Sequence, residues 1–238
     1  LVEQGDFAGG TSSKTSKLIH GGLRYLEQGR FGLVRESLRE RDTLRTIASE
    51  MVRPVSLMMP IYRGGVRSRH VIRAGLFLYD LLATGRSIHL HRMLGPSAAI
   101  EREARLRSNG LQAAAMFADC QMNDARLCLS NILQAMEFGA VCCNYVRVAQ
   151  LIKTSARLSG AVVQDVMTGT TCAARASVVI NATGPWSDAI RRMSDRETGA
   201  RMAPTKGTHL VVPGLSRQAL CLQVRRDRRI LFVLPWGE

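Results

Sequence analysis

Strand-like and helix-like segments alternate along the whole chain, and this order restricts the fold to the mixed α/β class. Residues 31–51 and 69–83 place apolar side chains at a helical period. Residues 124–138 begin with an aspartate and are followed by a glycine, which also predicts a helix. Residues 55–62 predict an edge strand, because the segment contains a proline that cannot donate to a neighbouring strand. Apolar segments on both sides of a turn at 168–169 predict a β-hairpin.

The composition is that of a folded protein with a hydrophobic core. Of the 238 residues, 46% are hydrophobic and 22% are charged. No apolar run reaches the roughly 18 residues that a membrane span needs. The six cysteines form no Cys-x-x-Cys pair, so we expect free thiols in a reducing, cytoplasmic compartment. The first residue is not methionine and the last segment resembles an interrupted strand, so we expect a piece of a longer protein.

The basic charge comes almost entirely from arginine. The net charge is +14, from 33 basic and 19 acidic residues, and only four of the basic residues are lysines. Clustered arginines bind phosphate, nucleic acid or anionic lipid. Here they are spread from Arg24 to Arg229 and only 5% of the residues are aromatic, which favours a solvated surface over a nucleic-acid-binding module. The arginines around 69–83 leave contact of that helix with a membrane surface open, but a core helix is the favoured interpretation.

The first segment that carries chemistry lies near the start of the chain. Glu3 ends a strand-like stretch and precedes a glycine-rich turn at 5–10. Dinucleotide-binding folds use an acid at this position to hold ribose hydroxyls. The hydroxyl-rich run from Thr11 to Lys17 offers several donors and a positive charge to a diphosphate. A solvated glutamate and a helix cap with surface serines explain the same residues, so the local pattern leaves both interpretations open.

His20 and Arg24 are the candidate substrate-facing residues. On a helix they would share a face, one turn apart. An imidazole has a pKa suited to a general base, and a guanidinium donates two parallel hydrogen bonds to a phosphate. Against this, a single histidine is often a packed or backbone-bonded side chain, and the glycines at 21 and 22 interrupt helices.

The pair His89 and His91 invites a metal interpretation. No cysteine or acid lies close to the pair in sequence, and no structural zinc pattern follows it. We therefore expect no metal site.

The run from Gly10 to Glu27 resembles the signature of the FAD-dependent, aerobic and quinone-linked glycerol-3-phosphate dehydrogenase family. It reads Gly-Thr-Ser-Ser-x-x-Ser-Lys-Leu-Ile-His-Gly-Gly-Leu-Arg-Tyr-Leu-Glu. Further stretches agree with that family in the same order, so the resemblance covers essentially the whole chain. They are Tyr79–Asp80, the helix start at Asp124, Asn181 to Trp186, Lys206 to His209, and Phe232 to Trp236.

This resemblance implies an α/β fold with two domains. One is a glutathione-reductase-like FAD-binding domain, incomplete in this chain, and the other is a β-sheet substrate domain of the flavin-oxidase type. We assign residues 1–52 and 121–190 to the FAD-binding domain, and residues 53–120 and 191–238 to the substrate domain.

The resemblance further implies oxidation of sn-glycerol 3-phosphate to dihydroxyacetone phosphate, with electrons passed from FAD to a quinone. It implies a cytoplasmic location with peripheral contact to the cytoplasmic face of the inner membrane, and it is compatible with a homodimer. No nucleic-acid partner is expected. The Gly-x-Gly-x-x-Gly turn that would precede Glu3 is not in the chain, so we expect the chain alone to be inactive.

Site residues are transferred from the family one by one. The residues implied to face the substrate are His20, Arg24 and Tyr25, with His20 taking the proton of the C2 hydroxyl. The residues implied to bind FAD are Glu3, Thr11, Ser12, Ser16, Lys17, Val148, Ala182, Thr183 and Gly184. Lys206 and His209 belong either to the active site or to a structural turn. The alternative activity is that of a related FAD-dependent oxidase that uses oxygen as acceptor or an amine as substrate.

Overall fold

The computed structural model describes residues 1–83, 85–195, 197–227 and 229–236, and for Arg24 it describes the backbone only. The chain forms two compact units, each built from two separate stretches. The first unit combines Leu1–Thr15 with Asp124–His209, and the second combines Ser16–Asn123 with Leu210–Glu238. These units alternate along the sequence as the predicted domains do, but they divide at other residues, and 16–52 belongs to the second unit. Which unit is the FAD-binding domain and which the substrate domain stays a prediction.

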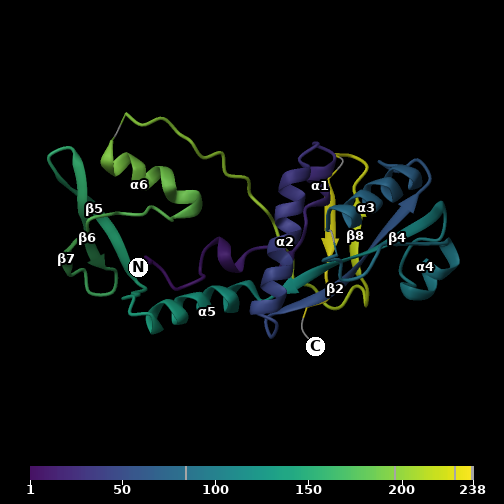
Figure 1. Cartoon of the computed structure of the whole chain (residues 1–238), viewed down its shortest axis with the longest axis horizontal. Helices are drawn as coiled ribbons and strands as arrows, with labels where there is room; N and C mark the ends of the chain where they lie inside the picture. Colours follow the sequence, from purple (N-terminus) through teal and green to yellow (C-terminus); the bar gives the residue numbers. More distant parts are fainter. Residues whose placement is uncertain (84, 196, 228, 237–238) are drawn as a thin grey trace. The chain divides into compact units, whose positions relative to one another are not determined.

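A mostly antiparallel sheet with the order β1-β4-β2-β8-β9 forms the centre of the second unit, with β3 paired to β4 (Figure 1). The two long strands β2 and β4 pair along almost their whole length, from Val52 opposite Met122 to Tyr62 opposite Leu111. The strands are β1 (Leu18–Ile19), β2 (Val52–Tyr62), β3 (Arg92–Leu94), β4 (Leu111–Met122), β8 (Ala219–Gln223) and β9 (Ile230–Val233).

The prediction that residues 55–62 form an edge strand is wrong, because β2 lies between β4 and β8. The prolines are tolerated because β8 is parallel to β2 and pairs with it only at Leu57 and Met58. Neither Pro54 nor Pro60 lies opposite a residue of β8, so no hydrogen bond of that short ladder is lost.

Helices cover both faces of this sheet. On one face, α3 (Arg69–Ala83) packs Ile72 and Leu76 against alternate residues of β2 and β4 such as Leu57. On the other face, α4 (Pro96–Arg102) packs Ala99 against Met58. The remaining helices are α1 (Leu23–Leu26) and α2 (Phe31–Ile47), which contact α3. The interpretation of 69–83 as a core helix is confirmed. None of the helices in the described ranges has the length and apolar character that a bilayer crossing requires.

The first unit contains a three-stranded antiparallel sheet in the order β5-β6-β7. The predicted hairpin is confirmed, because β6 and β7 pair across a turn in which Gly169 has φ of 77°. The elements are β5 (Val146–Thr154), β6 (Arg157–Asp165), β7 (Thr171–Arg175), α5 (Asp124–Glu137), α6 (Ser187–Ser194) and the 3₁₀ turns η1 (Thr11–Ser13) and η2 (Gly184–Trp186).

Glu103, directly after α4, fastens the segment that leads into β8. Its carboxylate accepts hydrogen bonds from the Ser216 hydroxyl at 2.5 Å and from the backbone N–H groups of Arg217 and Gln218 at 3.2 and 3.4 Å. Glu103 is only 5% exposed. The hydrogen bond from Ser216 is the main reason why the pKa of Glu103 lies below its usual value.

We predict that Glu103→Gln destabilises the chain by about 1 kcal/mol at neutral pH, because the donors lose a charged acceptor. The lowered pKa means that the carboxylate stabilises the fold above its unfolded-state pKa, and that this contribution disappears as pH falls through the folded-state pKa. Urea unfolding at several pH values measures the difference from the unmodified chain, which should shrink on acidification. Glu101, an exposed residue of α4, supplies the control Glu101→Gln. A penalty for Glu103→Gln that is the same at acidic and neutral pH would contradict the assignment.

Candidate functional site

The start of the chain runs parallel to residues 141–146 within the first unit. Val2 and Cys143 form a parallel bridge, and the Glu3 N–H donates to the Cys143 carbonyl at 2.9 Å. The Glu3 carbonyl in turn accepts from Val146 N–H at 2.9 Å, where β5 begins. Val148 lies two residues further along β5. Glu3 and Val148 are both predicted to bind FAD, and the structure places Val148 two residues beyond the backbone bond that joins Glu3 to β5.

The Glu3 carboxylate lies over the glycine-rich turn. Its Oε1 accepts a hydrogen bond from Gly5 N–H at 2.9 Å, and the side chain is exposed. This bond orients the carboxylate at the end of the parallel pairing, the position from which a dinucleotide fold binds ribose hydroxyls.

The hydroxyl-rich run forms the short turn η1 at Thr11–Ser13, and a buried carboxylate binds the run at Thr15. Asp124, at the start of α5, accepts from the Thr15 hydroxyl at 2.8 Å and from Thr15 N–H at 3.3 Å. Thr11 and Ser12 remain exposed. The hydroxyl groups predicted to face the diphosphate are thus solvent-accessible on a turn whose shape Asp124 fixes.

The segment Ala182–Gly184 lies close to this turn. A Cβ atom placed on Gly10 would meet the ring of Trp186 at 3.3 Å, so the backbone before Thr11 packs directly on the residue that ends η2. Gly184 has φ of 52°, in the left-handed region that glycine adopts freely, and open space lies next to its Cα. The Thr183 hydroxyl donates to Asn181 Oδ1 at 2.8 Å.

These residues form a donor and acceptor set that fits a dinucleotide. The set offers a carboxylate for ribose hydroxyls, exposed hydroxyls for a diphosphate, and an unobstructed glycine backbone for close approach. Seven of the nine predicted FAD-binding residues belong to the first unit: Glu3, Thr11, Ser12, Val148, Ala182, Thr183 and Gly184.

The other predicted residues belong to the second unit: Ser16, Lys17, His20, Arg24 and Tyr25. Ser16 is half-buried. Lys17 has φ of 60°, its carbonyl accepts from Met122 N–H at 2.8 Å, and its Nζ lies 5.5 Å from the centroid of the Trp236 ring. The side chain of Arg24 lies outside the described part of the structure, so its predicted contact with phosphate is not addressed.

The prediction that His20 and Arg24 share a helical face is wrong. α1 begins only at Leu23, and Gly22 before it has φ of 69°. A left-handed residue cannot continue a right-handed helix, so His20 lies in the loop that precedes α1. Its ring is exposed, and its Nδ1 accepts a hydrogen bond from Gly22 N–H at 3.0 Å. A neutral histidine that accepts at Nδ1 carries its proton on Nε2, so in this geometry Nε2 is a donor.

Both glycines of the loop are required by their surroundings. A Cβ on Gly21 would lie 2.5 Å from Tyr79 Oη and 2.6 Å from a methyl group of Leu38. A Cβ on Gly22 would lie 2.4 Å from the ring of Tyr25, in addition to the strain of its positive φ. The backbone beside His20 is therefore enclosed by two tyrosine rings and α2.

A buried polar network that the sequence analysis missed supports this loop. Tyr79 Oη accepts from Gly21 N–H at 2.8 Å and donates to Asp119 Oδ1 at 2.6 Å. Arg41 Nη1 donates to the same carboxylate oxygen at 2.8 Å and to the Ala118 carbonyl at 3.1 Å. Burial raises the pKa of Tyr79, so its hydroxyl stays protonated, and burial raises the pKa of Asp119 against the opposing effects of Tyr79 and Arg41. An aspartate inside an apolar strand was the sequence signal for this network, because a buried carboxylate needs partners.

The two histidines of the predicted non-metal pair make separate contacts. His89 Nε2 lies 2.9 Å from the Ser56 hydroxyl, and His91 Nδ1 lies 2.7 Å from Asp80 Oδ2. Among the described residues, no group of three or more metal-ligating side chains gathers. Lys206 and His209 are exposed in a stretch without helix or strand.

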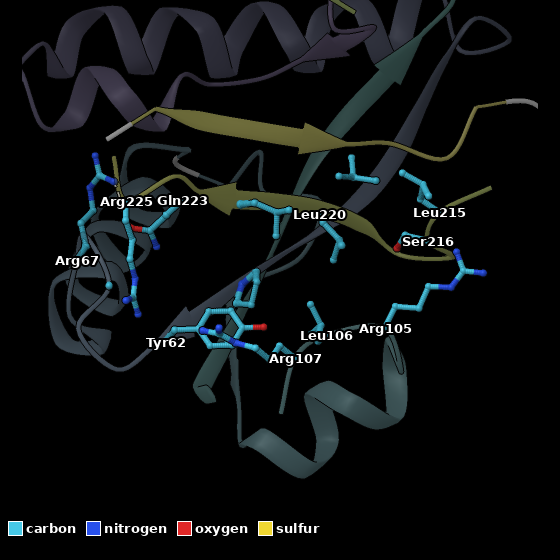
Figure 2. Close-up of a pocket in the computed structure, with 14 residues that line it drawn as sticks. Tyr62, Arg67, Arg105, Leu106, Arg107, Leu215, Ser216, Leu220, Gln223 and Arg225 are labelled. Atoms are coloured by element: carbon cyan, nitrogen blue, oxygen red, sulfur yellow. Dashed lines mark hydrogen bonds between the residues drawn. The ribbon is translucent and has the colours of Figure 1, made fainter. Parts of the chain in front are cut away.

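A pocket of about 410 Å³ in the second unit contains none of the predicted site residues (Figure 2). It is lined by four arginines, and each is held by another group of the protein. Arg67 binds Glu27, Arg105 donates to the Gly214 carbonyl at 2.9 Å, Arg225 donates to the Arg63 carbonyl at 2.6 Å, and Arg107 lies over the Tyr62 ring. The residues that line this pocket do not include those of the His20 loop, and we assign the pocket no part in the chemistry.

Comparison with known proteins identifies the class of protein. The sequence profile of the family described as FAD dependent oxidoreductase matches residues 1–238, so the chain belongs to that family. The predicted flavoprotein fold and the prediction of FAD as the family's cofactor are thereby confirmed.

Within this family the chain is similar to glycerol-3-phosphate dehydrogenases. It is 38% identical to the mitochondrial enzyme of Bos taurus, covering 100% of this chain and 35% of that protein. It is 40% identical to the enzyme of a Synechocystis species, covering 99% of this chain and 45% of that protein. The structure of the Bacillus halodurans glycerol-3-phosphate dehydrogenase in complex with FAD superposes with a TM-score of 0.72 at 26% identity, covering 99% of this chain and 40% of that chain.

A more distant match shows the fold alone. The L-proline dehydrogenase of P. horikoshii superposes with a TM-score of 0.53 at 17% identity, over 70% of this chain and 42% of that chain. Since the chain spans less than half the length of the relatives named above, the activity of the whole protein is a matter for proposal.

We predict that Gly22→Ala destabilises the chain by more than Gly29→Ala. The two glycines have nearly equal φ, 69° and 68°, but a Cβ on Gly29 meets nothing within 4 Å. Gly29→Ala should cost about 1 kcal/mol from backbone strain, and Gly22→Ala about 1 to 3 kcal/mol more because the Tyr25 ring must move. Urea unfolding of both variants measures the difference. Equal losses would show that Tyr25 does not pack on Gly22 in solution.

Proposed function

We propose that the protein containing this chain oxidises sn-glycerol 3-phosphate to dihydroxyacetone phosphate with FAD as its redox cofactor. The observation that supports this most is the loop His20–Tyr25, which presents an exposed imidazole on a backbone enclosed by Tyr25 and Tyr79. The same loop lies in the stretch that resembles glycerol-3-phosphate dehydrogenases, to which the chain is similar in sequence and structure.

In this proposal, one set of residues binds the cofactor and another set binds the substrate. Glu3 and the backbone at Val148 would hold the adenosine of FAD, and exposed hydroxyls of the first unit would hold its diphosphate. Bound FAD supplies the acceptor for the hydride that leaves C2 of the substrate. We propose that Arg24 and Tyr25 bind the phosphate end and that His20 accepts the proton of the C2 hydroxyl.

The observed hydrogen bond sets a condition on the role of His20. To accept a proton at Nε2, the ring must first place its own proton on Nδ1, which requires the bond from Gly22 N–H to Nδ1 to break. We propose that substrate binding supplies this change. A ring that kept the bond would instead donate from Nε2 to a substrate oxygen.

We predict that the full-length protein with FAD loses its flavin absorbance when glycerol 3-phosphate is added without oxygen. A flavin that stays oxidised with glycerol 3-phosphate but bleaches with an amine would move the protein to another class of flavin oxidase. In the protein that bleaches, His20→Gln keeps a side-chain N–H donor but cannot accept a proton. If His20 is the base, this variant reduces its flavin about 10² to 10⁴ times more slowly. A rate within tenfold of the unmodified protein would assign His20 the donor role.

We propose a quinone as the electron acceptor and peripheral contact with the cytoplasmic face of the membrane. The outer face of α3 supports a membrane contact, because Phe77 and Leu81 are 64% and 63% exposed. Leu76 cannot contribute to such a contact, since it is 2% exposed and packs in the core. The supporting side chains are therefore only those on the outer face of this helix.

We predict that changing Phe77 and Leu81 together to Ser lowers binding of the full-length protein to vesicles that contain anionic lipid at least severalfold, because apolar area at the interface is lost. Vesicle pelleting measures the bound fraction. Ile47→Ser, which alters a residue of α2 that is 74% exposed, is the control. Binding that is unchanged in the α3 variant would exclude this helix as the membrane contact.

A further inference from the structure

We propose that Arg41, Asp119 and Tyr79 are positioning residues for the His20 loop, acting through the backbone N–H of Gly21. This inference rests on the proposed function in assigning His20 a role with substrate, but the positioning itself is a property of the structure. The three side chains are buried, whereas the His20 ring is exposed.

The hydrogen bonds run in one direction from the loop to the ion pair. The Gly21 N–H belongs to the peptide that leaves His20, and it donates to Tyr79 Oη at 2.8 Å. The Tyr79 hydroxyl donates a hydrogen bond to Asp119 Oδ1 at 2.6 Å, and Arg41 Nη1 donates to the same oxygen at 2.8 Å. Because Tyr79 accepts from the loop and donates to the carboxylate, its hydroxyl has one orientation that satisfies both partners.

The far end of the network is fixed by backbone carbonyls. Arg41 donates to the carbonyl of Ala118 in β4 at 3.1 Å and to the carbonyl of Arg86, after α3, at 3.2 Å. Arg41 and Asp119 are each 2% exposed and Tyr79 is 3% exposed. A fully buried network with every partner in place is rigid, since each unpaired group would carry a desolvation penalty.

The position of the network indicates a role at the loop in addition to its role in packing. A buried ion pair contributes little stability compared with apolar side chains of the same size. Here the network ends at the peptide between His20 and Gly21, one residue before the left-handed Gly22. The peptide held by Tyr79 lies between the His20 ring and the Gly22 N–H that binds His20 Nδ1, so its orientation determines whether that bond forms.

Removing the Tyr79 hydroxyl should therefore loosen the His20 ring, whereas the aromatic ring of residue 79 keeps its packing. In Tyr79→Phe the Gly21 N–H keeps only a 3.4 Å approach to Asp119. We expect a mixture of His20 tautomers in place of the Nε2–H form. The control Tyr62→Phe removes the hydroxyl of a tyrosine on β2 that lies outside the network and should leave His20 in the Nε2–H form.

The experiment uses full-length protein with FAD and ¹⁵N-labelled histidine. Nitrogen NMR at pH 8 reports the tautomer of His20, whose signal is assigned by its loss in His20→Gln, and anaerobic rapid mixing reports the reduction rate. A tautomer mixture in Tyr79→Phe, with the Nε2–H form kept in Tyr62→Phe, supports the proposal. An unchanged His20 signal in folded Tyr79→Phe overturns it, whatever the rate.

The two proposals can fail separately. If glycerol 3-phosphate does not reduce the unmodified protein but Tyr79→Phe still shifts the His20 tautomer, positioning is supported and the proposed substrate is wrong. If Tyr79→Phe does not yield folded protein, the unmodified protein still tests the proposal, because the network requires His20 to be in the Nε2–H form. A mixture of His20 tautomers in the unmodified protein overturns it.

Discussion

The buried ion pair between Arg41 and Asp119 is the interaction on which the second unit depends. It joins α2 to β4 directly, reaches the end of α3 through the Arg86 carbonyl, and reaches the loop before α1 through Tyr79. Removing one partner of a buried pair leaves an uncompensated charge, which costs about 3 to 5 kcal/mol. These elements therefore cannot move apart separately, and the conformation of the loop is determined together with the helix packing.

Space and hydrogen bonding restrict the same few residues of the loop. Gly21 must lack a side chain because Tyr79 and Leu38 fill the volume that a Cβ would need, and the same closeness lets Tyr79 accept from its N–H. Gly22 must be left-handed for the chain to turn into α1, and in that conformation its N–H reaches His20. The exposed imidazole is thus oriented by buried groups.

Elements governed by local rules could be predicted from the sequence, and elements governed by distant partners could not. Helical period and end residues correctly predicted α3 and α5, and the turn residues predicted the β6–β7 hairpin. The edge-strand prediction for β2 was wrong because its second neighbour, β8, lies about 160 residues away in sequence. Arg41 could not be distinguished from the many surface arginines, since only the position of Asp119 decides that it is buried. The family signature supplied the predicted site residues, which stay predictions, but a helix through His20 was wrong because the left-handed Gly22 interrupts it.

The stretch that most resembles the family signature is divided between the two units after Thr15. On one side, Asp124 holds the hydroxyl-rich turn through Thr15, and on the other, Asp119 holds the His20 loop through Tyr79. These two aspartates lie five residues apart, at the end of β4 and the start of α5, about a hundred residues after the segment they shape. Side chains in the signature are the groups we propose for cofactor and substrate, whereas two buried carboxylates outside it hold the backbone that presents them. A chain that kept the signature but lost either aspartate would retain the chemical groups and lose their arrangement.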